Sequence, residues 1–507
     1  MSAVPLSRLL AGIAPVPRDV LLHDLTLDSR QVRAGGAFLA CRGARHHGLE
    51  FAAEVARRGA AAILWEPDGV AQPPAFESDI VLAAVPELSR RASELADRFF
   101  DLPSRELAVV GVTGTNGKTT CAWLLAQALT AAGQPAAYLG TLGSAFGGEL
   151  VAGEMTTPDA VTVQRQLAAF RGRGARRVAM EVSSHGLVQA RVQAVRFDAA
   201  VFTNLTREHL DFHGDMAAYG AAKATLFERG EVRLRVFNVD DAFGAELAAR
   251  FGAAGRIACS RSRSRAPAAP YLLARDPAYG TGGTSFRLES SFGGAQVATS
   301  LLGEFNVDNT LAVLAVLLGS GIGLAEAAAA MRNVRAPSGR LETFTRDGGP
   351  TAVVDYAHTP DALDKALQVL RRHCTGRLTV VFGCGGERDR GKRAEMGAIA
   401  ARRADRVVLT DDNPRGEDAE RIIADIAAGL GACRAAVIRE RRAAIRHALA
   451  GAAAGDVVLV AGKGHEQYQI TGTEKRFFSD QQVVREALEQ LQRGAAGSGG
   501  ASGGAPR

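Results

Sequence analysis

The sequence has few cysteines, and their spacing gives no sign of a metal site or a disulfide framework. Six cysteines occur in 507 residues, with no Cys-x-x-Cys pair and no histidine spacing that completes a zinc site. Unpaired thiols are typical of a reducing compartment. The sequence also lacks a run of about 20 apolar residues, and the N-terminal apolar stretch is interrupted by proline and arginine. We therefore expect a soluble, cytoplasmic protein with no membrane partner.

A strong excess of one charge is also lacking. Lysine and arginine total 60 against 54 acidic residues, a formal charge of +6. No basic stripe interleaved with aromatics occurs, which argues against nucleic acid as a partner and favours small anionic ligands. The basic run 260–265 is interpreted as a solvated loop. With 47% hydrophobic and 22% charged residues the chain is globular, and 57 glycines without a triplet period exclude a fibrous protein.

The length predicts about three domains at roughly 150 residues each. A polar turn at 101–104 and a Pro/Gly interruption at 336–339 mark the joins. The predicted domains are 1–100, 101–338 and 339–493, followed by a small, polar tail at 494–507 that we expect to be flexible. We expect a monomer.

Strand-like runs alternate with helical patterns, most regularly in the last third. Strands are predicted at 352–355, 378–382, 407–410 and 457–461, and a helix at 361–373 that Thr359 caps and Pro360 begins. This alternation predicts an α/β fold with mostly parallel, doubly wound sheets. Ligands of such sheets bind at the carboxyl ends of the strands.

A phosphate-binding loop is the strongest single motif. Residues 111–120 read GVTGTNGKTT between a buried strand and a helix predicted at 121–132. Small residues let backbone N–H groups converge on phosphate, lysine reaches the β- and γ-phosphates, and a hydroxyl suits Mg²⁺. The predicted ATP-binding residues are Gly114, Thr115, Asn116, Gly117, Lys118, Thr119 and Thr120. The exact GxxxxGK spacing is absent, because position 112 is valine.

Two further polar groups follow predicted strands. Glu181 ends a strand beside the phosphate loop, and a carboxylate there is a natural Mg²⁺ ligand. His209 and His213 are four residues apart, but the glutamate of an HExxH zinc site is absent. His213 alone is interpreted as structural.

The sequence GTNGKTT resembles the phosphate loop of the Mur ligase family, which includes folylpolyglutamate synthetases. The resemblance spans about Leu27 to Glu466. It implies a central P-loop domain, a smaller N-terminal α/β domain that binds a UDP-sugar and a C-terminal Rossmann-like domain that binds an amino acid. Matching positions for the UDP-muramoyl dipeptide are Leu27, Ser29, Ala44, Arg45, His46, Thr156, Thr157, Ser183, Gln189 and Arg191.

The resemblance also implies the metal and nucleotide contacts. It places Lys118, Glu181, His209 and Lys223 in the catalytic centre, and Thr119, Glu181, His209 and Lys223 around Mg²⁺. Lys223 matches a lysine that the family carbamylates, which converts a cation that repels Mg²⁺ into an anionic oxygen ligand. Asn306, Arg340 and Asp355 match contacts to ATP.

Amino-acid selection is expected in the last two loops. The segment Asp412-Asn413-Pro414-Arg415 matches the family's diaminopimelate signature, and Arg415 offers a bidentate guanidinium for the carboxylate that lysine lacks. Arg388, Gly462 and Glu466 match the remaining contacts, with Glu466 accepting the distal ammonium.

The resemblance therefore implies ATP-dependent amide formation. The D-glutamyl γ-carboxylate of the UDP-muramoyl dipeptide attacks ATP to give an acyl phosphate, which the amine of meso-diaminopimelate then attacks. Closure of the C-terminal domain is expected to exclude water from that intermediate. The alternatives are a lysine-adding or folylpolyglutamate-type ligase of the same family, and a P-loop switch that hydrolyses ATP without ligation.

Overall fold

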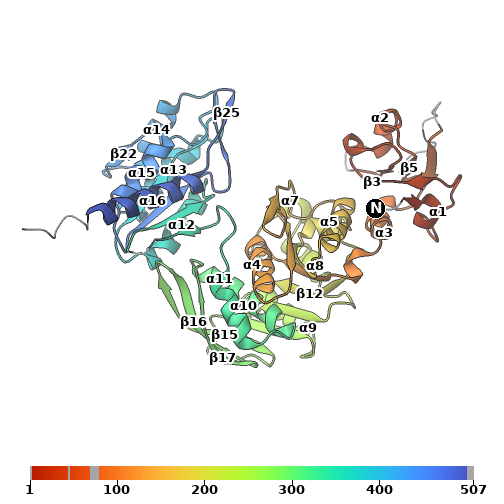
Figure 1. Ribbon diagram of the computed structural model, residues 1–507, viewed down its shortest axis with the longest axis horizontal. Coiled ribbons are helices and arrows are strands. Elements are labelled where there is room, and N and C mark those ends of the chain that lie inside the picture. The colour runs from red at the N-terminus through yellow and green to blue at the C-terminus, as the bar shows by residue number, and fades with distance from the viewer. Residues whose placement is uncertain (1–2, 44–45, 69–72, 74–78, 347, 499–507) are drawn as a thin grey trace, which may run out of the picture. The chain divides into compact units, whose positions relative to one another are not determined.

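The computed structural model describes residues 3–43, 46–68, 73, 79–346 and 348–498. Its internal contacts divide the chain into two compact units, one comprising Met1–Leu273 with Leu311–Gly323 and the other Ala274–Thr310 with Leu324–Arg507. Figure 1 traces the elements of both. Strand β15 (Tyr271–Gly280) and helix α10 (Glu304–Gly319) each run across the division along the chain. The boundaries expected near residues 101 and 338 stay predictions.

The first unit begins with a small parallel sheet. Its strands are β3 (Leu25–Thr26), β4 (Ala37–Ala40), β5 (Ala62–Trp65) and β6 (Val81–Ala84), in that spatial order. On one face pack residues of α1 (Leu6–Leu9), α3 (Leu88–Phe99) and α5 (Ala160–Gly172), and on the other those of α2 (Ala52–Arg57). The strands β1 (Val4–Pro5) and β2 (Leu21–Leu22) pair separately, and short 3-10 turns occupy Ser29–Gln31, Gly48–Phe51 and Pro103–Arg105.

A larger sheet carries the phosphate loop. Its parallel strands, in spatial order, are β8 (Ala136–Gly140), β11 (Arg177–Glu181), β7 (Ala108–Thr113), β12 (Phe197–Phe202), β13 (Leu234–Asn238), β14 (Arg256–Ser260) and the first residues of β15. The strands β9 (Gly143–Phe146) and β10 (Glu149–Val151) extend the β8 edge antiparallel. Strand β7 lies between β11 and β12, so the loops that follow these three strands meet at one edge.

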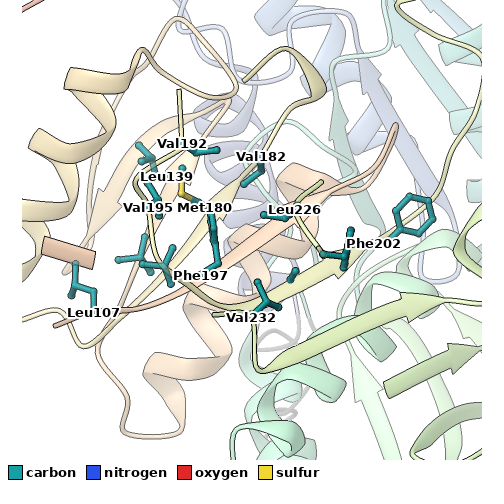
Figure 2. Packing of buried hydrophobic residues seen from close by; sticks show 14 of the residues in the cluster. Leu107, Leu139, Met180, Val182, Val192, Val195, Phe197, Phe202, Leu226 and Val232 are labelled. Atoms are coloured by element: carbon teal, nitrogen blue, oxygen red, sulfur yellow. The ribbon is translucent and has the colours of Figure 1, made fainter. Parts of the chain in front are cut away.

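Apolar side chains from these strands form the core of this sheet. Figure 2 shows Leu139, Met180 and Phe197 from three strands beside Val182, Val192 and Leu226 from the loops and helix ends. All are at most 1% exposed. The remaining helices are α4 (Lys118–Ala131), α6 (Ser184–Val188), α7 (Leu210–His213), α8 (Met216–Ala224) and α9 (Ala242–Arg250).

The second unit is built on a six-stranded sheet. The order is β18 (Glu342–Phe344), β19 (Thr351–Asp355), β23 (Val457–Ala461), β20 (Leu378–Phe382), β21 (Arg406–Leu409) and β22 (Ala435–Val437), parallel apart from the edge strand β18. Alternate residues of each buried strand enter two separate cores. The helices α12 (Pro360–His373), α13 (Gly391–Arg403) and α14 (Ala419–Ala427) cover one face, and α15 (Arg441–Ala450) and α16 (Asp480–Ser498) cover the other.

Three smaller elements complete the second unit. The strands β16 (Gly283–Ser290) and β17 (Gly293–Thr299) form a hairpin that continues the larger sheet beyond β15. The strands β24 (Tyr468–Thr471) and β25 (Glu474–Phe477) form a separate hairpin. Helix α11 (Leu324–Asn333) follows α10. The α/β prediction is confirmed, and strands β20 and β23 have the predicted bounds.

Two element boundaries differ from the sequence prediction. Helix α4 begins at Lys118 rather than residue 121, because Gly117 leaves the loop with φ 84° and the chain turns directly into the helix. Helix α16 continues to Ser498, five residues into the segment predicted as a flexible tail; its alanines extend a helix already nucleated upstream. Residues 499–507 lie outside the described part.

The remaining global expectations concern thiols and membranes. None of the six cysteines forms a disulfide bond. Within the described residues, no helix combines the length and the apolar character that crossing a bilayer requires.

Candidate functional site

The phosphate loop follows β7 and has room only for glycine at Gly114. Its φ is +146°, and a Cβ there would lie 1.9 Å from Thr203 Oγ1. Lys118 Nζ donates to the carbonyls of Gly114 at 2.9 Å and Thr115 at 2.7 Å, and burial lowers its pKa. Lys118, Thr119 and Thr120 form the first turn of α4, where free backbone N–H groups favour an anion.

The loop after β12 supports the phosphate loop from the neighbouring strand. Thr203 Oγ1 donates to the Asn116 carbonyl at 2.6 Å, and Asn116 N donates to Asn204 Oδ1 at 2.9 Å. Thr115 Oγ1 lies 3.2 Å from the Thr206 carbonyl. The loop conformation is therefore set by tertiary contacts rather than by its glycines alone.

Glu181, at the end of β11, is fully buried and gathers hydroxyl groups around its carboxylate. Thr119 Oγ1 donates to Oε2 at 2.8 Å, and Tyr138 Oη donates to Oε1 at 2.6 Å. Thr141 donates to the same carboxylate through its N–H at 2.8 Å and its hydroxyl at 3.1 Å. The structure thus brings together two predicted Mg²⁺ ligands, Thr119 and Glu181, as a set of hard oxygen donors that fits Mg²⁺.

Lys223 reaches the phosphate loop from helix α8. Its side chain is 1% exposed, and Nζ donates to the Gly114 carbonyl at 2.8 Å and lies 4.4 Å from the Tyr219 ring centroid. Burial is the larger cause that lowers the pKa of Lys223 to about 7, and the positive charge of Lys118 is the second cause. A lysine in a helix would ordinarily be exposed, so this burial is itself a finding.

His209, which is predicted at this site, and His213, which is predicted to be structural, have different surroundings. His213 Nε2 lies 2.9 Å from Ser184 Oγ. His209 adopts φ 56° at the start of α7, and its side chain is 42% exposed, with Nε2 3.5 Å from Glu208. In the described part of the chain, no three His, Cys, Asp or Glu side chains form a metal-binding group. The predicted Mg²⁺ ligands include only two side chains of these types, because the other two are the hydroxyl of Thr119 and the modified Lys223.

A cavity of about 1040 Å³ lies in the first unit and collects part of the predicted UDP-sugar site. Its lining includes Leu27, Ser29, His46, Met155 and Arg165. Asp28 caps the 3-10 turn that begins at Ser29 by accepting the Arg30 N–H. Ala44 and Arg45, also predicted here, lie outside the described residues.

The other predicted substrate contacts form a hydrogen-bonded cluster beside Glu181. Thr157 Oγ1 donates to the Glu181 carbonyl at 2.8 Å and accepts the Ser183 N–H at 2.9 Å. Arg191 donates to the Thr157 carbonyl at 2.6 Å and to Gln189 Oε1 at 2.5 Å. Thr156 Oγ1 lies 3.0 Å from Thr141 Oγ1. These predicted residues therefore lie close to the predicted metal ligands.

The predicted ATP contacts of the second unit occupy one turn, with one exception. Asp355, at the end of β19, accepts the N–H groups of Leu341 at 2.8 Å and Ala357 at 2.9 Å, and burial raises its pKa. Arg340 is exposed and its guanidinium carbon lies 5.7 Å from the Tyr356 ring centroid. Asn306 is buried and donates to the Leu302 carbonyl at 2.7 Å, so its amide nitrogen is engaged inside the fold.

The predicted amino-acid site forms where the loops after β20, β21 and β23 meet. Asn413 Nδ2 donates to Glu466 Oε2 at 3.0 Å. Arg415 adopts φ 53° and donates to the Gly386 carbonyl at 2.9 Å. A Cβ on Gly385 would lie 2.9 Å from Arg415 Nη1 and 3.6 Å from Cγ of the exposed Arg388. Both arginines therefore lie close to Gly385, in the loop after β20.

Close backbone packing holds the rest of this site. Asp412 is 9% exposed and burial raises its pKa. A Cβ on Gly462 would lie 2.7 Å from Asp412 Oδ2, and one on Gly386 would lie 1.9 Å from the Pro414 carbonyl. A side chain at Gly386 would therefore displace backbone, and one at Gly462, where φ is +116°, would strain the chain and displace the Asp412 carboxylate.

Three family models match the chain in order. Residues 21–99 match the Mur ligase family catalytic domain, 112–317 the Mur ligase middle domain, and 339–464 the Mur ligase glutamate ligase domain. The chain belongs to the Mur ligase family.

Two curated relatives of this Mur ligase share the name UDP-N-acetylmuramoyl-L-alanyl-D-glutamate–2,6-diaminopimelate ligase. The protein of Ectopseudomonas mendocina is 48% identical over 96% of this chain and 98% of its own length, and that of Pseudomonas aeruginosa is 47% identical over 93% and 96%. A solved structure with that name is 34% identical, with TM-score 0.75 over 97% of this chain and 100% of that chain. MurF from Acinetobacter baumannii, at 17% identity and TM-score 0.65, shares the fold.

Sequence reasoning missed two buried cations of this Mur ligase. Arg393, on α13, is 0% exposed and donates to Glu417 through two bonds of 2.8 Å and to the Gly385 carbonyl at 3.4 Å. This pairing joins the loop after β20 to the loop after β21 and lowers the pKa of Glu417 to about 2. Lys463 is equally buried and contacts Asn413. Lys463 lies between the predicted contacts Gly462 and Glu466, but its burial and that of Arg393 depend on partners from distant segments.

Proposed function

We propose that the chain is an ADP-forming ligase that joins meso-diaminopimelate to the D-glutamyl γ-carboxylate of UDP-N-acetylmuramoyl-L-alanyl-D-glutamate. The observation that carries this is the 47–48% identity to ligases with that name along almost the whole chain. The reaction is a step of cytoplasmic peptidoglycan precursor synthesis, required for cell-wall growth, cell shape and division. Its partners are the three small-molecule substrates.

The first chemical step brings two anions together. The γ-carboxylate attacks the γ-phosphorus of ATP, an acyl phosphate forms and ADP leaves. The ammonium of Lys118, in the first turn of α4, donates to the carbonyls of Gly114 and Thr115. When ATP binds, the ammonium exchanges these carbonyls for phosphate oxygens and screens the repulsion between the two anions. The amine of diaminopimelate then attacks the acyl carbon, and phosphate leaves.

Four residues would hold Mg²⁺, namely Thr119, Glu181, His209 and carbamylated Lys223. When bound, the metal neutralises phosphate charge. The buried carboxylate of Glu181 with its ring of hydroxyls supports this assignment. The lowered pKa of Lys223 supports its modification, since only the neutral amine adds CO₂. His209 completes the proposed set.

Substrate selection is proposed to lie in two places. The cavity lined by Leu27, Ser29 and His46 takes the UDP group, and Thr157, Ser183 and Arg191 lie toward the dipeptide. In the second unit, Arg415 and Arg388 take the carboxylate that distinguishes diaminopimelate from lysine, and Glu466 takes the distal ammonium.

Phosphate release from ATP tests the proposal. The purified chain receives the UDP-muramoyl dipeptide with diaminopimelate, with lysine, or with neither. We expect release only with diaminopimelate, together with a UDP-muramoyl tripeptide identified by mass. Equal phosphate release with lysine would indicate a lysine-adding ligase. Phosphate release without diaminopimelate or lysine would indicate an ATPase switch. Either result would reject the proposal.

A further inference from the structure

Lys463 is a fully buried cation in the loop that follows β23. Its side chain is 0% exposed, and Nζ donates to Asn413 Oδ1 at 3.0 Å and contacts Glu466 Oε2 at 3.4 Å. The ring centroid of Tyr468 lies 5.6 Å from the same nitrogen. The ammonium therefore touches two side chains that the proposed function assigns to the amino-acid substrate.

These contacts fix the orientation of the Asn413 amide. Oδ1 accepts from both Lys463 Nζ and the Ile470 N–H, each at 3.0 Å. An amide whose oxygen is held by two donors must direct its NH₂ group to the other side. That group donates to Glu466 Oε2 at 3.0 Å.

Glu466 thereby receives two donors at one oxygen, Asn413 Nδ2 and Lys463 Nζ. A carboxylate held in this way cannot rotate freely, so its position toward a ligand is set before the ligand binds. Burial lowers the pKa of Lys463, and the carboxylates of Asp412 and Glu466 oppose that fall. The surrounding carboxylates thus favour the charged form that makes both bonds.

We propose that Lys463 is a positioning residue for the amino-acid substrate, which holds Asn413 and Glu466 in the orientation that receives the substrate's distal ammonium group. The inference rests on the proposed function. Lys463 itself does not contact the substrate, because its side chain is enclosed.

The test compares Lys463→Met with Lys475→Met. Methionine retains the unbranched shape and most of the length of the side chain and removes the ammonium. Lys475 also lies over the Tyr468 ring, with Nζ 4.0 Å from its centroid, but it is exposed on hairpin β24–β25. The measurements are the KM values for diaminopimelate, ATP and the UDP-muramoyl dipeptide, the kcat and the melting temperature of the full chain.

In Lys463→Met we expect KM for diaminopimelate to rise about 10-fold or more, with the other two KM values within about 2-fold of wild type. Lys475→Met should match wild type. Adding Glu466→Gln to Lys463→Met should cost no more than Glu466→Gln alone, because both changes disrupt one network. An unchanged KM for diaminopimelate, additive losses, or a parallel rise of all three KM values with a lower melting temperature would overturn the proposal.

Two controls keep the outcomes separate. Wild-type protein that releases no diaminopimelate-dependent phosphate contradicts the proposed function, whereas active wild type with an unaffected Lys463→Met contradicts only this inference. If Lys463→Met does not fold, Lys463→Gln, which keeps a donor without the charge, is judged by the same criteria. Failure of both to fold would assign Lys463 to the fold and reject the positioning role.

Discussion

Lys223 Nζ donates a hydrogen bond to the carbonyl of Gly114 at 2.8 Å, so a lysine of helix α8 lies against a glycine of the phosphate loop. Because burial lowers its pKa to about 7, much of this lysine is a neutral amine near pH 7 to 8. The neutral amine is the form that reacts with CO₂. The contact therefore places a carbamylation-ready group where phosphate and metal charge are expected.

Replacing Lys223 by alanine should abolish most activity and allow partial chemical rescue. We expect kcat to fall about 100-fold or more, and added acetate to restore part of it, since a small carboxylate supplies the oxygen ligand that the carbamate provided. Phosphate release with and without acetate is the measurement. Lys365→Ala, at an exposed lysine paired with Asp361, is the control. Full activity of Lys223→Ala would remove the proposed role.

Arg415→Met should reduce use of diaminopimelate selectively. Losing charge-assisted bonds to a substrate carboxylate costs about 10- to 100-fold in kcat/KM, whereas kcat/KM for lysine, which lacks that carboxylate, should change little. The control is Arg421→Met, an exposed arginine on α14. If both amino acids lost the same factor, Arg415 would serve the loop conformation rather than selection.

The ion pair Arg441–Asp480 should be a strong determinant of the second unit's stability. Both side chains are 0% exposed, with bonds of 2.8 and 2.7 Å, and Arg441 also donates to the Ala461 carbonyl at 3.0 Å. Arg441→Met alone should destabilise by about 3–5 kcal/mol, because it leaves Asp480 buried and unpaired, and Arg441→Met with Asp480→Leu should recover much of that loss.

Denaturant unfolding of the full chain measures these effects. The neighbouring Arg442 provides the matched control, because its pair with Glu486 is about one-third exposed. Arg442→Met should cost at most about 1 kcal/mol. Equal losses in the two single variants would contradict the argument from burial.

His373 should make stability depend on pH. Nδ1 lies 2.8 Å from the Gly280 carbonyl and Nε2 accepts the Gly303 N–H at 2.9 Å, an arrangement that requires the neutral ring. Burial lowers its pKa below the ordinary 6.5. As pH falls through 6.5 the unfolded chain takes up a proton before the folded chain does, so stability is lost on acidification.

Melting temperatures measured between pH 8 and pH 5 test this pH dependence. The range extends about 1.5 units on either side of the ordinary histidine pKa of about 6.5. In His373→Gln the melting temperature should be lower throughout and fall less steeply below pH 6.5. His447→Gln, an exposed histidine on α15, should retain the wild-type slope. An unchanged slope in His373→Gln would show that other groups carry the acid sensitivity.

The local pattern alone determined much of this protein. The Thr359 cap and Pro360 start of α12, the strands β20 and β23 and the phosphate loop are specified by side-chain periodicity, capping chemistry and glycine spacing within a few residues. These features depend on interactions between sequence neighbours, so they are readable before the chain is folded.

Tertiary structure decided which side chains meet and which are enclosed. The Lys223–Gly114 contact, the ring of hydroxyls around Glu181 and the Lys463–Asn413–Glu466 network each join segments that are distant in the sequence. Parallel sheets place loops distant in sequence at one edge, and burial there shifts pKa values that a linear chain leaves at their ordinary levels. The sequence by itself determined which chemical groups are present, and only packing determined their charge, orientation and partners.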